Sequence, residues 1–208
     1  KRYGKLVDKN ESENTKADSN IFGASVLFSY QKKFEKPTIE EGFNNIRHIK
    51  FERQLDPTYT NKAIILDYDG TLRETISGDI YPTTPSDIRI LPNRKAVLRD
   101  YSDNGYLILG VSNQSGIGSG KFLEGDAINC FDKTNELLEM PIDYKYCPHK
   151  AGPTNCYCRK PMPGLGVEFI EKYGLDPSRC IMVGDMTSDK TFAKRCGFQY
   201  MDQAEFFK

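Results

Sequence analysis

Residues 62–71 read KAIILDYDGT, a short continuous apolar run that ends in a polar turn. A run of this kind is typical of a strand buried inside a parallel sheet, where helices cover both faces. Two aspartates, Asp67 and Asp69, follow the run directly, and Gly70 permits a tight backbone turn after them. We therefore expect a buried strand whose carboxyl end carries acidic side chains.

The alternation of short apolar strands with helices continues toward the C-terminus. We expect further strands at residues 106–111, 144–147 and 180–184, and helices at residues 91–104, 127–140, 164–173 and 188–196. This alternation predicts an α/β fold, a Rossmann-like three-layer arrangement around one parallel sheet. In such sheets the ligand lies at the carboxyl ends of the strands, and each predicted strand ends there in a polar or glycine-rich turn.

The chain upstream of this domain lacks the alternation. Residues 1–20 are polar and aperiodic, which indicates a mobile tail, and residues 21–30 (IFGASVLFSY) read as a strand. Asp56 and Pro57 mark a turn or linker. We expect an N-terminal extension over residues 1–60 and an α/β domain over residues 61–208.

The composition narrows the classes of function. The chain has 208 residues with 29 Lys+Arg against 29 Asp+Glu, which argues against a strongly basic coat for nucleic acid but allows a local basic groove. No apolar run approaches the ~18 residues of a membrane span, so we expect no membrane partner. Six cysteines are too few for a disulfide scaffold of this size, which favours a reducing, cytoplasmic compartment.

Asp67 and Asp69 point to the same side if strand geometry persists into the turn. One aspartate can then attack phosphorus to form an aspartyl phosphate, while the other protonates the leaving alcohol and later activates water. Two carboxylates this close need a cation between them, and an oxygen-only ligand set indicates Mg²⁺. Taken alone, the same residues are also compatible with an Asx turn and a helix N-cap.

The turns after the later strands supply groups that suit a phosphate. Ser112 and Asn113 follow the second strand, where a hydroxyl and successive backbone N–H groups can hold phosphate oxygens. Lys160 would neutralise both the phosphoryl group and the nucleophilic aspartate. Asp185 can complete the metal shell, with Asp189 as a supporting group. The alternatives are a serine N-cap, a solvated lysine and an acidic pair at a helix N-terminus.

Four potential zinc ligands lie within twelve residues, in the pattern C-x-H-x₆-C-x-C. They are Cys147, His149, Cys156 and Cys158. Three thiolates and an imidazole make a closed tetrahedral shell, so we expect a structural zinc ion rather than a catalytic one. The zinc would hold in place the segment that delivers Arg159 and Lys160 to the phosphate. Buried or free thiols with a surface histidine are the alternative.

The order Asp-x-Asp-Gly-Thr, Ser-Asn-Gln, Lys-Pro and Gly-Asp-x-x-x-Asp resembles the haloacid dehalogenase (HAD) superfamily of phosphatases, from about residue 62 to residue 208. The resemblance implies Asp67 as the nucleophile, Asp69 as the general acid and base, and Lys160 as a catalytic phosphate-holding residue. It implies Mg²⁺ ligands at Asp67, Asp69 and Asp185. Substrate or phosphate contacts are implied at Thr71, Ser112, Asn113, Arg159 and Lys160.

Residues 147–164, CPHKAGPTNCYCRKPMPG, resemble the zinc-loop members of HAD subfamily IIIA. These include heptose-bisphosphate 7-phosphatases and some histidinol-phosphate phosphatases. The intervals between the motifs leave no room for a separate cap domain, so we expect a capless, open site. An open site suits a phosphate on a bulky or polymeric substrate as well as on a small sugar.

Two further resemblances favour nucleic-acid ends. Residues 192–207 look like the phosphatase half of polynucleotide kinase/phosphatases, and residues 37–51 look like the closing segment of the P-loop kinase domains often joined to them. Residues 116–121, GIGSGK, do not match the P-loop pattern itself, so we expect no nucleotide-kinase site there.

Three functions follow from these patterns. The main expectation is removal of a 3′-phosphate from DNA or RNA ends, with an upstream kinase-like domain as a covalently linked partner. The alternative is a phosphatase that acts on a sugar phosphate such as heptose bisphosphate, or on histidinol phosphate. The third is a non-catalytic, zinc-stabilised binding module, which the presence of both Asp67 and Asp69 disfavours.

Overall fold

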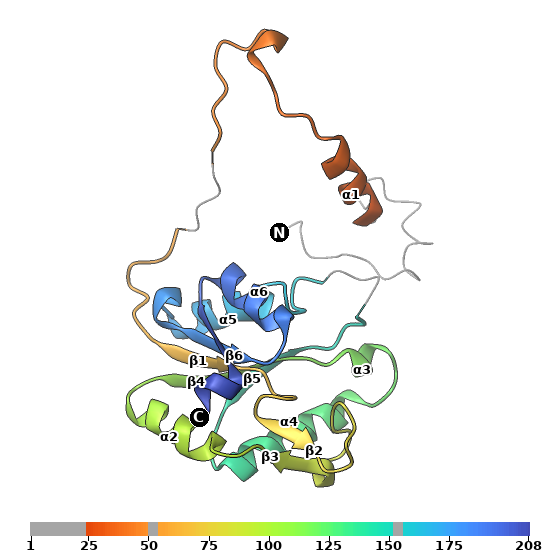
Figure 1. Cartoon of the computed structure of the whole chain (residues 1–208), viewed down its shortest axis with the longest axis vertical. Helices are drawn as coiled ribbons and strands as arrows, with labels where there is room; N and C mark the ends of the chain where they lie inside the picture. Colours follow the sequence, from red (N-terminus) through yellow and green to blue (C-terminus); the bar gives the residue numbers. More distant parts are fainter. Residues whose placement is uncertain (1–23, 50–53, 152–155) are drawn as a thin grey trace.

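The computed structural model describes residues 24–49, 54–151 and 156–208 (Figure 1). Within these residues the main sheet has five strands in the order β5-β4-β1-β6-β7, and every neighbouring pair is parallel. The strands are β1 (Ala63–Leu66), β4 (Leu107–Asn113), β5 (Asp143–Cys147), β6 (Ile181–Gly184) and β7 (Gln199–Asp202). The predicted α/β fold with a parallel sheet is confirmed.

Helices cover both faces of the sheet, as the three-layer prediction requires. Helices α5 (Gly164–Tyr173) and α6 (Thr187–Cys196) lie on one side, and α2 (Arg94–Asp103) and α4 (Glu124–Leu138) lie on the other (Figure 1). Strand β1 is buried along its whole length, and its side chains point alternately to the two faces of the sheet. Ile65 packs in the hydrophobic core on the side of α5 and α6, whereas Ile64 packs in the core on the side of α2 and α4. The central strand is apolar throughout because neither of its faces meets water.

Between β1 and α2 the structure describes every residue and shows a small antiparallel hairpin. It consists of β2 (Arg73–Thr75) and β3 (Ile88–Ile90), with the short 3-10 turn η3 (Pro85–Asp87) before β3. A hairpin of this size is much smaller than a domain, in agreement with the expected capless architecture. The sequence did not predict the hairpin, because its strands are too short to carry a period-two pattern.

Several other elements were not predicted either. The edge strand β7 is half exposed and lacks a continuous apolar run, so it has no clear strand pattern. The short helices α3 (Ser115–Gly118) and α7 (Gln203–Phe206) and the 3-10 turns η2 (Ile39–Glu41) and η4 (Pro177–Arg179) are each about one turn long. Elements this short do not contain enough residues to show a periodic pattern of apolar side chains.

The predicted strand at residues 21–30 is wrong where the structure describes it. Residues Ala24–Lys33 form helix α1, which stands apart from the sheet in Figure 1. A strand needs a neighbour for its backbone hydrogen bonds, whereas a helix satisfies its own, and this segment has no place in either sheet. The tail predicted at residues 1–20 lies outside the described residues. Among those described, none of the helices is long and apolar enough to cross a bilayer.

Candidate active site

The carboxyl ends of three central strands bring the predicted site residues to one edge of the sheet. Asp67 follows β1, and its backbone N–H donates to the carbonyl oxygen of Val183 on β6 at 3.0 Å. Leu66 pairs in register with Gly110 of β4 and with Val183, so Ser112 near the end of β4 and Asp185 just after β6 lie at the same edge. Parallel pairing alone therefore gathers residues from three distant parts of the sequence.

Lys160 lies at the centre of the buried charges. Its Nζ atom is 2.5 Å from Asp67 Oδ1 and 2.7 Å from Asp189 Oδ1, and it donates to the backbone oxygen of Val111 at 3.1 Å. Burial alone would lower the pKa of Lys160, but the two carboxylates outweigh it and raise the pKa above its ordinary value. Lys160 therefore stays a cation in contact with both aspartates.

The Asp67 carboxyl is buried, and one ammonium does not fully compensate its charge. Burial raises the pKa of Asp67 to about 7, with further contributions from the charges of Asp189 and Asp69, while Lys160 acts in the opposite direction. A carboxylate in this setting is fully ionised at neutral pH only if a further cation approaches. The site chemistry thus fits a metal ion next to Asp67.

Three carboxylates are grouped closely enough to share such an ion. Oxygen atoms of Asp67, Asp185 and Asp189 all lie within 4.8 Å of one another, and hard oxygen ligands suit Mg²⁺. The observed group differs from the sequence-based ligand set, which had Asp69 in place of Asp189. Burial also raises the pKa of Asp185 above its usual range.

The turn at Gly70 lets Asp185 approach this group. Gly70 has φ of +81°, and a Cβ atom placed there would sit 2.5 Å from Asp185 Oδ2. Any side chain at this position would push the Asp185 carboxylate away or strain the backbone. Gly70 therefore permits both the tight turn after Asp69 and the close approach of the loop that carries Asp185.

Asp69 is held away from the grouped carboxylates by two donors. The Nε atom of Arg73 donates to Asp69 Oδ1 at 2.8 Å, and the Nε2 atom of Gln114 donates to Asp69 Oδ2 at 3.0 Å. Gln114 also donates to the hydroxyl of Ser112 at 2.9 Å, so the O–H of Ser112 remains a donor. This network ties the second aspartate of the turn to the end of β4.

The side chain of Asn113 pairs with the backbone of Lys160, and the expected phosphate contact at Asn113 stays a prediction. Its Nδ2 atom donates to the Lys160 carbonyl oxygen at 2.9 Å, and its Oδ1 atom accepts from the Lys160 N–H at 2.9 Å. This two-point pairing fixes the backbone that carries the buried ammonium. Thr71 and Arg159 each have one buried polar atom, Oγ1 and Nη1, without a hydrogen-bond partner among the described residues. Such atoms suit contact with a ligand.

The four predicted zinc ligands lie together. Cys147 Sγ is 3.3 Å from Cys156 Sγ, and His149 Nδ1 is 3.5 Å from Cys147 Sγ and 3.2 Å from Cys158 Sγ. The corners of a tetrahedron around zinc would be roughly 3.8 Å apart for Zn–S bonds of ~2.3 Å, so this cluster is close to the size of a zinc shell. Burial raises the pKa of the Cys147 and Cys158 thiols, so a cation is needed to hold them as thiolates.

The loop that carries these ligands is seated against α3. The backbone N–H of Gln114 donates to the Cys147 carbonyl oxygen at 2.8 Å, and the N–H of Gly118 donates to that of Pro148 at 2.8 Å. A Cβ atom at Gly118 would lie 2.7 Å from the Pro148 oxygen, so only glycine permits this approach. Because Lys160 follows Cys158 by two residues, the seated loop also sets the place of the ammonium.

Arg73 and Gln114 were missed as site residues by sequence reasoning. Gln114 lies within the Ser-Asn-Gln motif, but neither residue has a pattern of its own that signals contact with Asp69. The only signal was their position next to the two motifs. Their partner becomes evident only when β1, β4 and the hairpin are folded together.

Comparisons with known proteins find phosphatases. The family model described as "Polynucleotide kinase 3 phosphatase" matches residues 62–207. The chain is 38% identical over 139 residues to a Thermoplasma volcanium protein named "Probable D-glycero-D-manno-heptose-1,7-bisphosphate 7-phosphatase", a match that covers 64% of this chain and 92% of that protein. It is 33% identical to the D-glycero-beta-D-manno-heptose-1,7-bisphosphate 7-phosphatase of Haemophilus influenzae, over 62% of this chain and 73% of that protein.

A solved structure gives the same result. The D,D-heptose 1,7-bisphosphate phosphatase from B. bronchiseptica, crystallised with magnesium and phosphate, superposes with a TM-score of 0.60 at 26% identity, over 67% of this chain and 78% of that chain. These similarities establish a phosphomonoesterase activity class. The chain therefore belongs to the polynucleotide kinase 3 phosphatase family, among the HAD-superfamily phosphatases of the zinc-loop subfamily IIIA kind.

Proposed function

We propose that this phosphatase hydrolyses a small sugar phosphate of the heptose-bisphosphate type. The observation that carries this proposal is the 38% identity to the heptose-bisphosphatase relative, which extends over 92% of that protein. Sugar-phosphate hydrolysis was the alternative expectation from the sequence, and removal of a 3′-phosphate from nucleic-acid ends was the main one. The similar fold of the B. bronchiseptica phosphatase, whose structure holds magnesium and phosphate, supports the same class of substrate.

The geometry supports a two-step reaction. In the first step a carboxylate oxygen of Asp67 attacks phosphorus, the bond from phosphorus to the ester oxygen breaks, and Asp69 gives its proton to that oxygen. In the second step the ionised Asp69 accepts a proton from water, the water oxygen bonds to phosphorus, and the bond to Asp67 breaks. Inorganic phosphate leaves, and both aspartates return to their starting states.

The remaining residues bind and orient. Lys160, held by its contacts to Asp67 and Asp189, would face the phosphoryl oxygens as a fixed cation. Ser112 would donate its hydroxyl hydrogen, and the unpartnered Thr71 Oγ1 and Arg159 Nη1 atoms would serve as further contacts. Each of these groups is already placed before substrate arrives, which lowers the cost of orientation.

Two metals fit the residues present. Asp67, Asp185 and Asp189 would hold Mg²⁺, which when bound neutralises the charge that gathers on the carboxylates and phosphate oxygens. Cys147, His149, Cys156 and Cys158 would hold a structural Zn²⁺ that keeps the loop before Lys160 in place.

A second candidate is the removal of a 3′-phosphate from DNA or RNA ends. The match of the polynucleotide kinase 3 phosphatase family model over residues 62–207 favours it, and a capless site would admit a polymer end. The domain boundary expected near residue 60 lies close to the start of that match, and it remains a prediction. The interpretation of residues 37–51 as the closing segment of a kinase-like domain also remains a prediction.

A substrate panel separates the two candidates. The purified chain with Mg²⁺ is assayed for phosphate release from heptose 1,7-bisphosphate, histidinol phosphate and a 3′-phosphorylated oligonucleotide. We expect kcat/KM on the heptose bisphosphate to exceed that on the oligonucleotide by at least about 100-fold. The reason is that a site shaped for one substrate stabilises the transition state of that substrate more than the transition state of another. A preference in the opposite direction would reject the sugar phosphate in favour of the second candidate. Phosphate release from no member of the panel would reject both.

A further inference from the structure

Arg73 is a buried cation whose charged group lies against Asp69. It is the first residue of β2, its exposed fraction is 1%, and its Nε atom donates to Asp69 Oδ1 at 2.8 Å. A fully buried arginine is costly unless its charge and its N–H groups find partners. The partners of Arg73 determine how firmly its guanidinium is held against Asp69.

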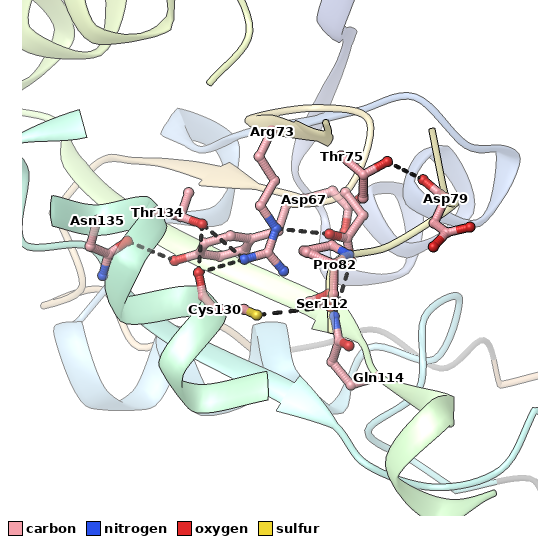
Figure 2. Close-up of polar contacts among 12 residues, drawn as sticks. Asp67, Arg73, Thr75, Asp79, Pro82, Ser112, Gln114, Cys130, Thr134 and Asn135 are labelled. Atoms are coloured by element: carbon pink, nitrogen blue, oxygen red, sulfur yellow. Dashed lines mark hydrogen bonds and ion pairs between the residues drawn. The ribbon is translucent and has the colours of Figure 1, made fainter. Parts of the chain in front are cut away.

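Helix α4 supplies the other partners of Arg73. Its Nη1 atom donates to the Cys130 carbonyl oxygen at 2.7 Å and to Thr134 Oγ1 at 2.8 Å, as Figure 2 shows. The guanidinium carbon is 5.2 Å from the ring centre of Tyr68 and 5.1 Å from that of Phe131. These contacts fix the plane of the guanidinium, so Asp69 is held by a group that is itself anchored to α4.

The two oxygens of Asp69 have different neighbours. Oδ1 accepts a charge-assisted hydrogen bond from the guanidinium of Arg73. Among the residues that the structure describes, the donor to Oδ2 is the neutral amide of Gln114, at 3.0 Å. A carboxylate oxygen has two lone pairs, so Oδ2 keeps one for a proton.

We propose that Arg73 is a positioning residue that acts through Asp69. By occupying Oδ1 and fixing the carboxylate plane, it leaves Oδ2 as the atom that carries the proton to the leaving oxygen and later takes one from water. This inference rests on the proposed function, since it requires that Asp69 act as general acid and base. It adds a residue, Arg73, to which neither the motifs nor the metal groups assign a role.

The leaving group provides the test, because only a poor one needs a proton. An alkyl phosphate releases an alkoxide unless it is protonated, whereas 4-nitrophenyl phosphate releases a stable phenolate. We expect Arg73→Met to lower kcat/KM on an alkyl phosphate such as glycerol 3-phosphate by about 100-fold, within the range of general acid catalysis. On 4-nitrophenyl phosphate the loss should be at least about ten times smaller. Equal losses on both substrates would overturn the proposal.

A double-mutant cycle with Asp69→Asn shows whether Arg73 acts through Asp69. If it does, adding Arg73→Met to Asp69→Asn causes little further loss on the alkyl phosphate, since the acid is already absent. Independent, additive losses would contradict the proposal. Arg89→Met is the matched control, because Arg89 is an exposed arginine on the neighbouring strand β3 whose Nε pairs with Glu74. It should leave the ratio of the two activities as in the wild type.

A second variant covers the case in which Arg73→Met does not fold. Thr134→Val removes one anchor of Arg73 at nearly constant volume and touches neither Asp69 nor substrate. It should shift the ratio of the two activities in the same direction by a few-fold, and an unchanged ratio in folded protein would count against the proposal. A wild-type chain that releases no phosphate from heptose 1,7-bisphosphate would instead reject the proposed function.

Discussion

The ammonium of Lys160 lies 2.5 Å from Asp67 Oδ1, although 93 residues separate the two in the chain. The same ammonium lies 2.7 Å from Asp189 Oδ1. One buried cation thus serves two carboxylates, and the pKa of Asp67 still rises to about 7. The site therefore has too little positive charge to balance its carboxylates, and a bound metal ion would supply the rest.

Replacing Asp67 by asparagine should abolish turnover while the chain remains folded. The amide cannot attack phosphorus, and loss of a nucleophile typically costs at least about 10⁴-fold in kcat. Asp189 keeps Lys160 paired in the variant, so the fold should survive. Phosphate release and a thermal melt measured on the same preparation check both halves of the prediction. Near-normal kcat in Asp67→Asn would contradict the assignment of Asp67 as nucleophile.

Magnesium should stabilise the protein more at high pH than at low pH. The pKa of Asp67 in the folded, metal-free chain is about 7, above the ~3.9 of an unfolded aspartate. Between these values the folded state holds a proton that the unfolded state has lost, so stability from this group falls as pH rises toward 7 and stays low above it. Magnesium binds the ionised form, so it competes with a proton below pH 7 and not above.

The measurement is the rise in melting temperature on adding Mg²⁺, compared at pH 5.5 and pH 8. We expect the larger rise at pH 8. A larger rise at pH 5.5, or the same rise at both, would show that proton release from Asp67 is not linked to metal binding.

Changing Gly70 to alanine should weaken Mg²⁺ binding. The new Cβ atom would lie 2.5 Å from Asp185 Oδ2 and displace one of the three grouped carboxylates. The matched control is Gly78→Ala, since Gly78 also has a positive φ, +88°, but nothing lies within 4 Å of its added Cβ. Both variants carry the backbone strain of ~1–2 kcal/mol, but only one carries the clash. Calorimetric titration should show at least a tenfold weaker Mg²⁺ affinity for Gly70→Ala alone; equal affinities would mean that Asp185 is not a ligand.

Changing Asn113 to alanine tests whether this residue positions Lys160 or contacts phosphate. The variant loses two hydrogen bonds to the Lys160 backbone, at a cost of about 2 kcal/mol in unfolding free energy. A displaced ammonium should also lower kcat, by up to about 100-fold. Urea unfolding and steady-state kinetics give the two values. Unchanged stability with weaker inhibition by inorganic phosphate would instead support a phosphate contact by the Asn113 side chain.

The cysteine–histidine cluster should hold one zinc ion per chain. Changing Cys156 to serine should remove the zinc, lower the melting temperature and reduce activity, because the loop leads directly to Lys160. Cys180→Ser is the control: Cys180 is a buried cysteine outside the cluster, so its change should lower stability and leave the zinc content at one. Metal analysis of protein purified without chelator measures both. An absence of zinc in the wild type would reject the structural role.

The sequence alone carried the fold and the chemistry of the motifs. Short apolar strands such as residues 62–67 can be buried on both faces only in a covered parallel sheet, and this dictates where their polar ends gather. Helix α5 begins and ends at the residues predicted, because Gly174 terminates it in the left-handed conformation. The grouping of the four cysteine and histidine side chains likewise required no structure, since they are neighbours in the chain.

Only the tertiary structure decided how the charges pair. It placed Asp189 rather than Asp69 with Asp67 and Asp185, and it gave Asp69 a cation of its own, Arg73. It also turned the region near residue 30 into a helix, where the sequence indicated a strand. Apolar periodicity reports which side chains of a segment are buried, and each segment carries that pattern by itself. The partner of a charge or of a backbone hydrogen bond depends on how the chain folds around it, within one tight turn for Asp69 and Arg73 and between distant segments for Asp67 and Asp189.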